Sequence, residues 1–318
     1  MFNDPQFFQT IGYTLAMAGG YIVGKIFKLS TEICLFIAAL VGALVAGSGL
    51  DVFRHFAEGS VTYFDIGLIF IFATLFMNIL KESGAMDLIV RWIIRAFGNK
   101  KVFFLILLMI VMLIPGALTG AGSISVLVVG GTVSAALSAM GLKKERVAAI
   151  VFIVAGLSAA APPINVWAMM TCAGTAVPYV GFTMPLLVPI LILGLFTVLF
   201  LGWKGKISNI EEALKTIPEP KGLSVWSVAI PFIVLVALLS LPRIFPFDFP
   251  LLGLPLSFAL SALVAWIMNY KRVKVFRVMA DTVAQLTPLI ATTTVVGMFV
   301  QVMSFNGTKG LFSLWIVT

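Results

Sequence analysis

The stretch AGLSAAAPPINVWAMM, from Ala155 to Met170, places two adjacent prolines in the middle of an uncharged apolar run. The run extends over 147–177 and has the length and composition of a membrane-spanning helix. A proline inside a helix removes a backbone donor and clashes with the preceding turn, at a cost of about 3 kcal/mol. We therefore predict a transmembrane helix over 147–177 that is broken at Pro162 and Pro163.

The composition of the whole chain agrees with a membrane location. Its 318 residues are 61% hydrophobic and 11% charged, and the mean hydropathy is +1.12, whereas a soluble domain carries about 25% charged residues. The N-terminal residues lack the basic region of a cleavable signal. The apolar runs predict an all-α, polytopic membrane protein with helices at 11–27, 33–50, 64–80, 102–114, 124–140, 147–177, 183–202, 224–241, 253–270 and 283–305.

The residue inventory argues against several functional classes. Cys34 and Cys172 lie in apolar runs and are expected to be free thiols, and His55 is the single histidine, so a zinc site is not expected. No phosphate-binding GxxxxGK[ST] motif occurs. No pair of acids and no Ser–Lys arrangement falls at midplane depth, so we expect no enzyme. The net charge of +8 lies in loops, which favours a lipid bilayer rather than nucleic acid as the partner.

A second break is predicted in the 40-residue segment VFFLILLMIVMLIPGALTGAGSISVLVVGGTVSAALSAMG, residues 102–141. This segment is too long for one tilted helix, and Pro115, Gly116, Gly120 and Gly122 fall in its middle. Two half-helices of about 13 to 17 residues each would cross only part of the hydrocarbon. The segment therefore predicts a re-entrant helical hairpin.

The distribution of basic residues predicts the topology. If the hairpin enters and leaves on one face, that face receives 18 of the 21 Lys and Arg residues, and the other receives Arg54, Arg243 and Lys309. Cytoplasmic loops carry an excess of basic residues. We therefore expect a multi-pass protein of the cell (inner or plasma) membrane with its N-terminus outside and its basic loops in the cytoplasm.

A constant offset of 223 aligns residues 29–95 with residues 252–318. Gly84 then pairs with Gly307, Leu88 with Leu311, Trp92 with Trp315 and Asn78 with Gln301. Combined with the topology, the offset predicts inverted repeats, which are typical of secondary transporters. The expected organisation is a first repeat over 1–203, a cytoplasmic linker with an amphipathic helix over 204–223, and the start of a second repeat over 224–318. The second copy lacks its hairpin and broken helix, so we expect this sequence to be a fragment of a longer protein, or another chain to supply that half.

The two breaks contain the candidate ion and substrate site. Pro162 and Pro163 would free the carbonyls of about Ser158 to Ala161 for a cation, and the helix that resumes after them would present its N-terminus to a carboxylate. Asn165 adds a side chain that both donates and accepts. The hairpin tip supplies hydroxyls and flexible backbone from Thr119, Gly120, Gly122, Ser123 and Ser125. Asn78 is either a ligand or an interhelical hydrogen-bond partner; the two breaks could also be a simple kink and a close helix contact.

The order of these features resembles the large membrane subunit of the tripartite ATP-independent periplasmic (TRAP) transporters, within the ion transporter superfamily. The similar segments are 66–98, with Ser83 and Gly84 at its turn, TGAGSISVLVVGGTVSAALSAMG (119–141), and KKERVAAIVFIVAGLSAAAPPINVWAMM (143–170). The resemblance implies a sodium-driven carrier of organic acids such as C4-dicarboxylates. It also implies a small membrane subunit and a periplasmic solute-binding protein as partners. The break reads PPIN where the family usually has PPS.

Two alternatives stay open at this point. The first is a proton-coupled or antiport carboxylate carrier of the same superfamily that uses no binding protein. The second is a membrane scaffold subunit that does not transport. Sodium dependence of uptake separates the first from the TRAP type, and saturable binding of substrate or Na⁺ excludes the second.

Overall fold

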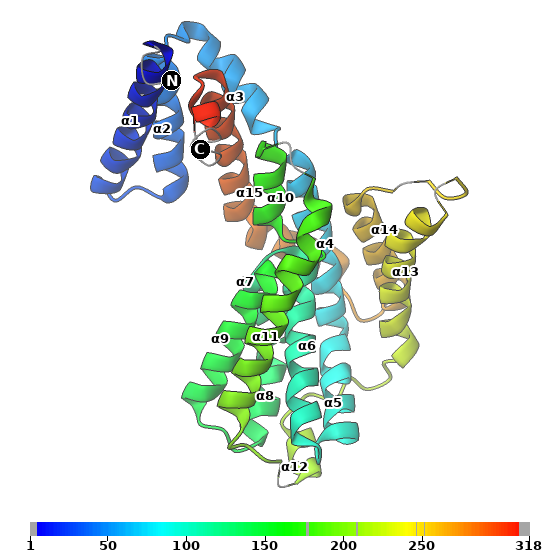
Figure 1. The fold of residues 1–318 in the computed structure, drawn as a ribbon. Coiled ribbons are helices and arrows are strands. Elements are labelled where there is room, and N and C mark those ends of the chain that lie inside the picture. Colours follow the sequence, from blue (N-terminus) through cyan, green and yellow to red (C-terminus); the bar gives the residue numbers. More distant parts are fainter. Residues whose placement is uncertain (1–4, 176–177, 208, 246, 251, 312–318) are drawn as a thin grey trace. The chain divides into compact units, whose positions relative to one another are not determined.

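The computed structural model describes residues 5–175, 178–207, 209–245, 247–250 and 252–311, and all regular structure within them is helical (Figure 1). Among these residues, six helical segments are long and apolar enough to cross a membrane: Gly49–Ser83, Lys101–Thr119, Gly122–Ala139, Thr183–Gly202, Val225–Pro242 and Val275–Phe305. Two shorter apolar helices, Thr31–Val45 and Leu254–Met268, accompany them. The chain is thus an all-α, multi-pass membrane protein, which confirms the predicted class.

The chain divides into two compact units, one formed by residues 1–67 with 285–318 and the other by residues 68–284. Helices α4 (Phe64–Ser83) and α15 (Val275–Phe305) each run from one unit into the other. Both predicted breaks lie in the second unit.

The first unit is built on a helical hairpin of α1 (Pro5–Ile26) and α2 (Thr31–Val45), followed by η1 (Gly49–Asp51) and α3 (Val52–Ser60). Its core contains Met17, Ala39, Ala43, Val52 and Val302. Small residues allow the helices to approach closely, and a Cβ added at Gly42 would lie 2.4 Å from Met17 Cγ. The helix expected over 33–50 ends at Val45, because Gly47 and Gly49 adopt positive φ angles of 81° and 53°.

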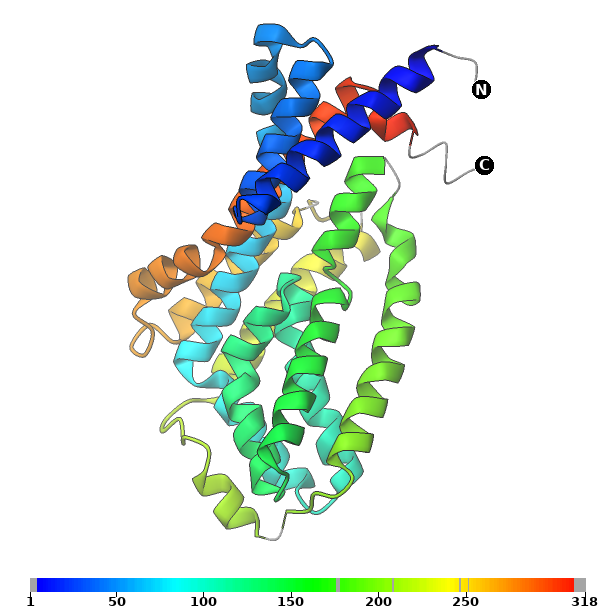
Figure 2. The same cartoon turned by 90° about the vertical axis from the view of Figure 1, so that its left-hand side faces the viewer.

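The centre of the second unit is a group of three adjacent helices: α6 (Lys101–Thr119), α9 (Lys144–Ala160) and α11 (Thr183–Gly202) (Figure 2). α5 (Ala85–Phe97) and α8 (Gly131–Ala139) pack beside them. The buried face of α6 carries large apolar side chains, among them Phe104, Leu108 and Met112. These helices therefore form the packed support for both breaks.

The basic ends of these helices gather at one end of the second unit. Lys101 Nζ donates to Trp203 O at 2.7 Å, and Arg146 donates to Leu201 O at 3.4 Å. Lys206 N donates to Met140 O at 2.9 Å, which holds the end of α8 against the segment after α11. The segment over 102–141 therefore starts and finishes at the same end, as a hairpin requires. That this end faces the cytoplasm stays a prediction.

Within its described residues, 204–207 and 209–223, the expected linker contains one short helix, α12 (Ile210–Lys215). Asn209 caps it by accepting from Glu211 N at 2.9 Å. α13 (Val225–Ile244) follows and packs against α14 (Leu254–Met268). The last span begins at Val275 rather than at 283, because α15 continues without interruption through the segment after the Lys271 turn.

Several features of the two units coincide under the offset of 223. The bounds of α2 map onto those of α14. Gly84 and Gly307 both have positive φ angles, 84° and 78°, and each accepts a 3.1 Å hydrogen bond from the residue four positions on. Trp315, the expected partner of Trp92, lies outside the described residues. The coincidences agree with a repeat, and the repeat and its inversion stay predictions.

Candidate functional site

The predicted hairpin turns at Gly120, which has a φ angle of 69°. α6 ends at Thr119, and a helical arm starts at Gly122 as α7 (Gly122–Ser125), continues through the π-helical segment η2 (Val126–Gly130) and finishes as α8. The helix expected to stop at 114 therefore runs five residues further, with Pro115 and Gly116 inside it. The helix therefore breaks at Gly120 and not at Pro115.

The hydroxyl of Ser125 bonds to backbone groups of α6 beside Pro115. In a regular helix Gly116 N would donate to Met112 O; here Gly116 N donates to Ser125 Oγ at 2.9 Å, and Ser125 Oγ donates to Met112 O at 2.7 Å. The serine hydroxyl thus bridges the two backbone groups and keeps both satisfied. Thr119 adds a bond from its hydroxyl to Pro115 O at 2.7 Å.

The second break lies where the prolines predict it. α9 (Lys144–Ala160) and α10 (Val166–Thr175) are separated by five residues, 161–165. The broken helix starts at Lys144 rather than at 147, and its expected end at 176–177 lies outside the described residues. Asn165 connects the two halves: its Nδ2 donates to Ala160 O at 3.1 Å, and its Oδ1 accepts from Ala168 N at 3.0 Å. Asn165 is therefore the N-cap of α10 as well as a tie to α9.

The two breaks are in direct contact (Figure 2). Ile164 N, inside the helix break, donates to Ala117 O of α6 at 3.1 Å. Ser158 Oγ lies 3.0 Å from Ser125 Oγ and 2.6 Å from Ala155 O, and its single proton serves one of them. Residues about 40 positions apart in the sequence thus form one connected polar cluster inside an apolar surrounding.

Glycines are required where the breaks meet. A Cβ added at Gly116 would lie 2.0 Å from Ser158 Oγ, and one at Gly122 would lie 2.3 Å from Ala155 O. At Gly120 it would lie 2.3 Å from Val166 Cγ2 and 3.4 Å from Val166 N. The last distances place the N-terminus of α10 beside the hairpin turn, so two helix N-termini converge there.

Where the two helix N-termini meet, both backbone N–H groups and backbone carbonyls lack hydrogen-bond partners among the described residues. The N–H groups of Gly122, Ser123, Val166 and Trp167 have none. The carbonyls of Ala159 and Ala161 also have none within the described ranges, because the residue four positions after Ala159 is Pro163, which has no N–H, and Asn165 N, four positions after Ala161, donates to Tyr179. The surrounding sequence over 102–142 and 147–203 contains no Asp, Glu, Lys or Arg. The local electrostatics therefore come from helix termini and hydroxyls, which favour a carboxylate at the N–H groups.

The structure changes the expected role of several candidate residues. Thr119, Ser125, Ser158 and Asn165 are buried and already hydrogen-bonded within the chain, so they hold the breaks together. Contrary to the expectation of four free carbonyls, Ser158 O accepts from Ala161 N at 3.2 Å and Ala160 O accepts from Asn165. The candidates with accessible surface are Gly122, Ser123, Pro162 and Pro163, whereas Gly120 and Ala161 are buried.

The hydrogen bond that the structure shows for Asn78 does not involve the polar cluster at the two breaks. Its Nδ2 donates to Thr282 Oγ1 at 2.9 Å, between α4 and α15. The interhelical alternative is therefore the one that this geometry favours.

Three contributors to the site were missed by the sequence reasoning. Ala117 and Ile164 act through their backbones, which no side-chain pattern reveals. Tyr179, in η3 (Tyr179–Phe182), accepts from Asn165 N at 3.1 Å, and burial raises the pKa of its phenol. Nothing in the sequence around Pro178 and Tyr179 indicates that the Tyr179 hydroxyl contacts the helix break.

Comparison with known proteins adds no relative: no protein-family model matches the chain, and no curated protein matches it. The class defined by the fold is an all-α, multi-pass membrane protein whose second unit contains a helical hairpin packed against a proline-broken helix. What the chain does must be inferred from those two breaks.

Proposed function

We propose that this chain is the permease part of a secondary active transporter for small organic acids such as C4-dicarboxylates, driven by a sodium gradient. The observation that carries the proposal is the direct contact of the two breaks, where unpaired N–H groups from two helix N-termini lie together in an uncharged part of the chain. Non-helical backbone at membrane depth is tolerated only where it is buried in protein or lines a water-filled cavity. Backbone of this kind forms the sites of many transporters.

In this proposal the substrate carboxylate accepts hydrogen bonds from the free N–H groups of Gly122, Ser123, Val166 and Trp167. The Ser123 side chain is exposed and adds one hydroxyl. Sodium, a hard cation, takes oxygen ligands, and the free carbonyls of Ala159 and Ala161 offer two of them. Each bound ion neutralises the field that the other one meets, so binding of the two is coupled.

The family resemblance extends the proposal to location and partners. The protein would lie in the inner or plasma membrane with its N-terminus outside. A periplasmic solute-binding protein would deliver the substrate, and a small membrane subunit would brace the chain. Access would alternate through movement of one repeat-derived bundle against another.

The sharpest test removes one N–H group without disturbing the helix. Val166 is the first residue of α10, where proline fits because its N–H is not used by the helix. The Val166→Pro variant should lower sodium-driven uptake of labelled succinate about tenfold, the equivalent of one hydrogen bond to a charged group. The matched control is Val225→Pro at the first residue of α13, which should leave uptake unchanged.

Uptake is measured in membrane vesicles from cells that produce the protein with its native partners, with and without an inward sodium gradient. Equal kinetics for the two proline variants would reject the site. Uptake that follows a proton gradient and ignores sodium would replace the proposal with the proton-coupled alternative.

One observation favours a second candidate, a scaffold subunit that does not transport. Four candidate polar side chains are buried and bonded within the chain, as expected if the breaks only pack helices together. Titration of succinate and Na⁺ against the purified chain separates the candidates, because a scaffold shows no saturable binding.

A further inference from the structure

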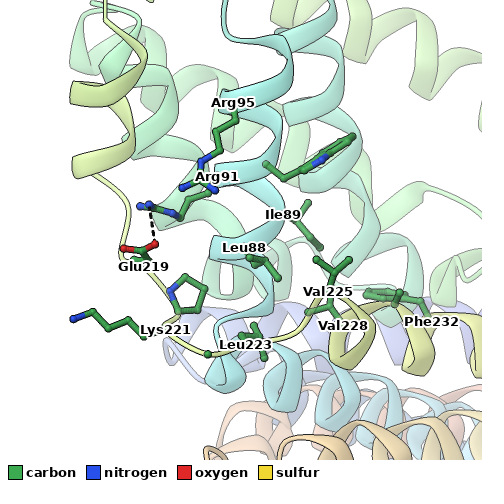
Figure 3. Close-up of a pocket in the computed structure, with 14 residues that line it drawn as sticks. Leu88, Ile89, Arg91, Arg95, Glu219, Lys221, Leu223, Val225, Val228 and Phe232 are labelled. Atoms are coloured by element: carbon green, nitrogen blue, oxygen red, sulfur yellow. Dashed lines mark ion pairs between the residues drawn. The ribbon is translucent and has the colours of Figure 1, made fainter.

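A cavity of about 660 Å³ lies in the second unit, between α5, residues 219–223 and the first two turns of α13 (Figure 3). None of the candidate residues at the two breaks lines it. Its volume falls within the range of about 300 to 1,000 Å³ that is typical of small-ligand sites. The cavity is therefore large enough for a small ligand that is distinct from the substrate proposed for the two breaks.

The cavity is charged on one side and apolar on the other. Figure 3 shows Arg91, Arg95 and Lys221 on one side, and Val225 and Phe232 on the opposite side. The apolar side is completed by Leu88, Ile89, Leu223, Val228 and Ala229. Over the eight residues from Val225 to Phe232 the apolar wall extends about 10 Å along α13. An occupant with a charged head and an apolar chain matches this division.

The cavity wall keeps a net positive charge after the ion pair between Arg91 and Glu219 is taken into account. Three basic residues and one acidic residue line the wall. The acid, Glu219, lies 3.7 Å from Arg91 Nη2, and Arg91 also donates to Leu214 O at 2.6 Å and to Ile217 O at 2.7 Å. Arg91 thus anchors the linker to α5. Arg95 and Lys221 are exposed, and no acid on the wall remains to neutralise them.

Two further features place the cavity at a membrane surface. α13 enters a span of apolar sequence at Val225, so the residues just before it lie near the lipid phosphates. Trp92 on the cavity wall is 58% exposed, and Trp226, which follows the lining residue Val225 in the chain, is 67% exposed. Exposed tryptophans are typical of the boundary between hydrocarbon and water. Arg272 strengthens the positive rim, because its guanidinium donates to Lys221 O.

From this charge complementarity we propose that the cavity binds one anionic phospholipid. The phosphate lies at Arg95 and Lys221, and an acyl chain lies along Leu88, Val228 and Phe232. Basic pockets at the cytoplasmic ends of membrane helices are suited to such head groups. The lipid would connect α5 to α13, two helices that the linker joins through Arg91.

The test compares phosphatidylglycerol with phosphatidylcholine on the purified 318-residue chain by native mass spectrometry. We expect phosphatidylglycerol to be retained selectively. The double variant Arg95→Gln with Lys221→Gln should bind it about 30-fold more weakly, about fivefold for each basic residue removed beside an anionic surface. The control, Lys143→Gln with Lys144→Gln, removes the same charge from exposed positions elsewhere and should bind like the unchanged chain.

A second measurement locates the lipid and keeps the test independent of folding. Phosphatidylglycerol with a photoreactive group in its acyl chain should form adducts within residues 223–232 and 88–92, and Ala229→Trp should remove them by filling the apolar side. Equal retention of the two lipids, or adducts spread over the lipid-facing helices, would overturn the proposal. A protein–protein adduct from Val225→Cys in native membranes, in place of the lipid adduct, would assign the cavity to another chain and overturn it as well.

Discussion

Replacing Asn165 with alanine should release the first turn of α10 from the end of α9. Asn165 is 6% exposed, and its side chain makes two bonds that alanine cannot replace. Loss of the cap to Ala168 N costs about 1 kcal/mol, and leaving Ala160 O unsatisfied costs about 1 to 3 kcal/mol. Together these costs are about 2 to 4 kcal/mol, which corresponds to local opening that is about 30- to 1,000-fold more frequent.

Amide hydrogen exchange on the detergent-solubilised chain measures this opening at a named site. Ala168 N–H should exchange faster by the factor above, since the local opening free energy governs its protection. Asn165→Asp keeps the capping oxygen and loses the donor to Ala160 O, so it should give a smaller acceleration. Asn99→Ala, at an exposed position after α5, is the control. Exchange of Ala168 in Asn165→Ala within twofold of that control would refute the argument that this side chain joins the halves.

Three other changes test the contacts around the breaks and the linker. Gly116→Ala should destabilise the chain by about 1 to 3 kcal/mol, since its Cβ would lie 2.0 Å from Ser158 Oγ. The control, Gly156→Ala, has open space around the added Cβ and should be neutral or stabilising. Thermal unfolding measures both effects. Pro162→Ala combined with Pro163→Ala should allow membrane insertion and abolish substrate uptake; unchanged uptake kinetics would contradict the proposed site. Arg91→Met should cost about 3 kcal/mol by removing its two charged hydrogen bonds and should free the linker for proteolysis, which limited trypsin digestion detects.

The sequence was informative wherever a residue type restricts the backbone directly. The prolines at 162–163 located the helix break, and the glycines at 120 and 122 located the hairpin turn. Pro115 misled the prediction, because α6 continues past it to Thr119 and the Ser125 hydroxyl, ten residues later in the chain, bonds to the neighbouring backbone groups Gly116 N and Met112 O. Periodicity and composition cannot reveal such a compensation, since it depends on how the returning arm is positioned.

The sequence located the two breaks, and it did not reveal what their polar side chains bond to. The two breaks do meet, yet Ser125, Ser158 and Asn165 bond to the chain itself instead of facing a ligand. A polar residue in an apolar run indicates that something polar lies nearby, and the residue alone does not tell whether that is a solute or the protein's own backbone. The cavity beside α5 was also missed, since its walls come from segments more than 120 residues apart.

The position of the Ser125 hydroxyl within the backbone of α6 restricts how this protein can move. Pulling the two arms of the hairpin apart would break both hydrogen bonds between the Ser125 hydroxyl and the backbone of α6, and losing hydrogen bonds in an apolar surrounding is costly. We therefore expect the two arms, one of which also accepts a hydrogen bond from Ile164 N at Ala117 O, to move as one rigid block. Any movement of this block would then occur through the short connections at its basic end, around residues 98–100 and 141–143.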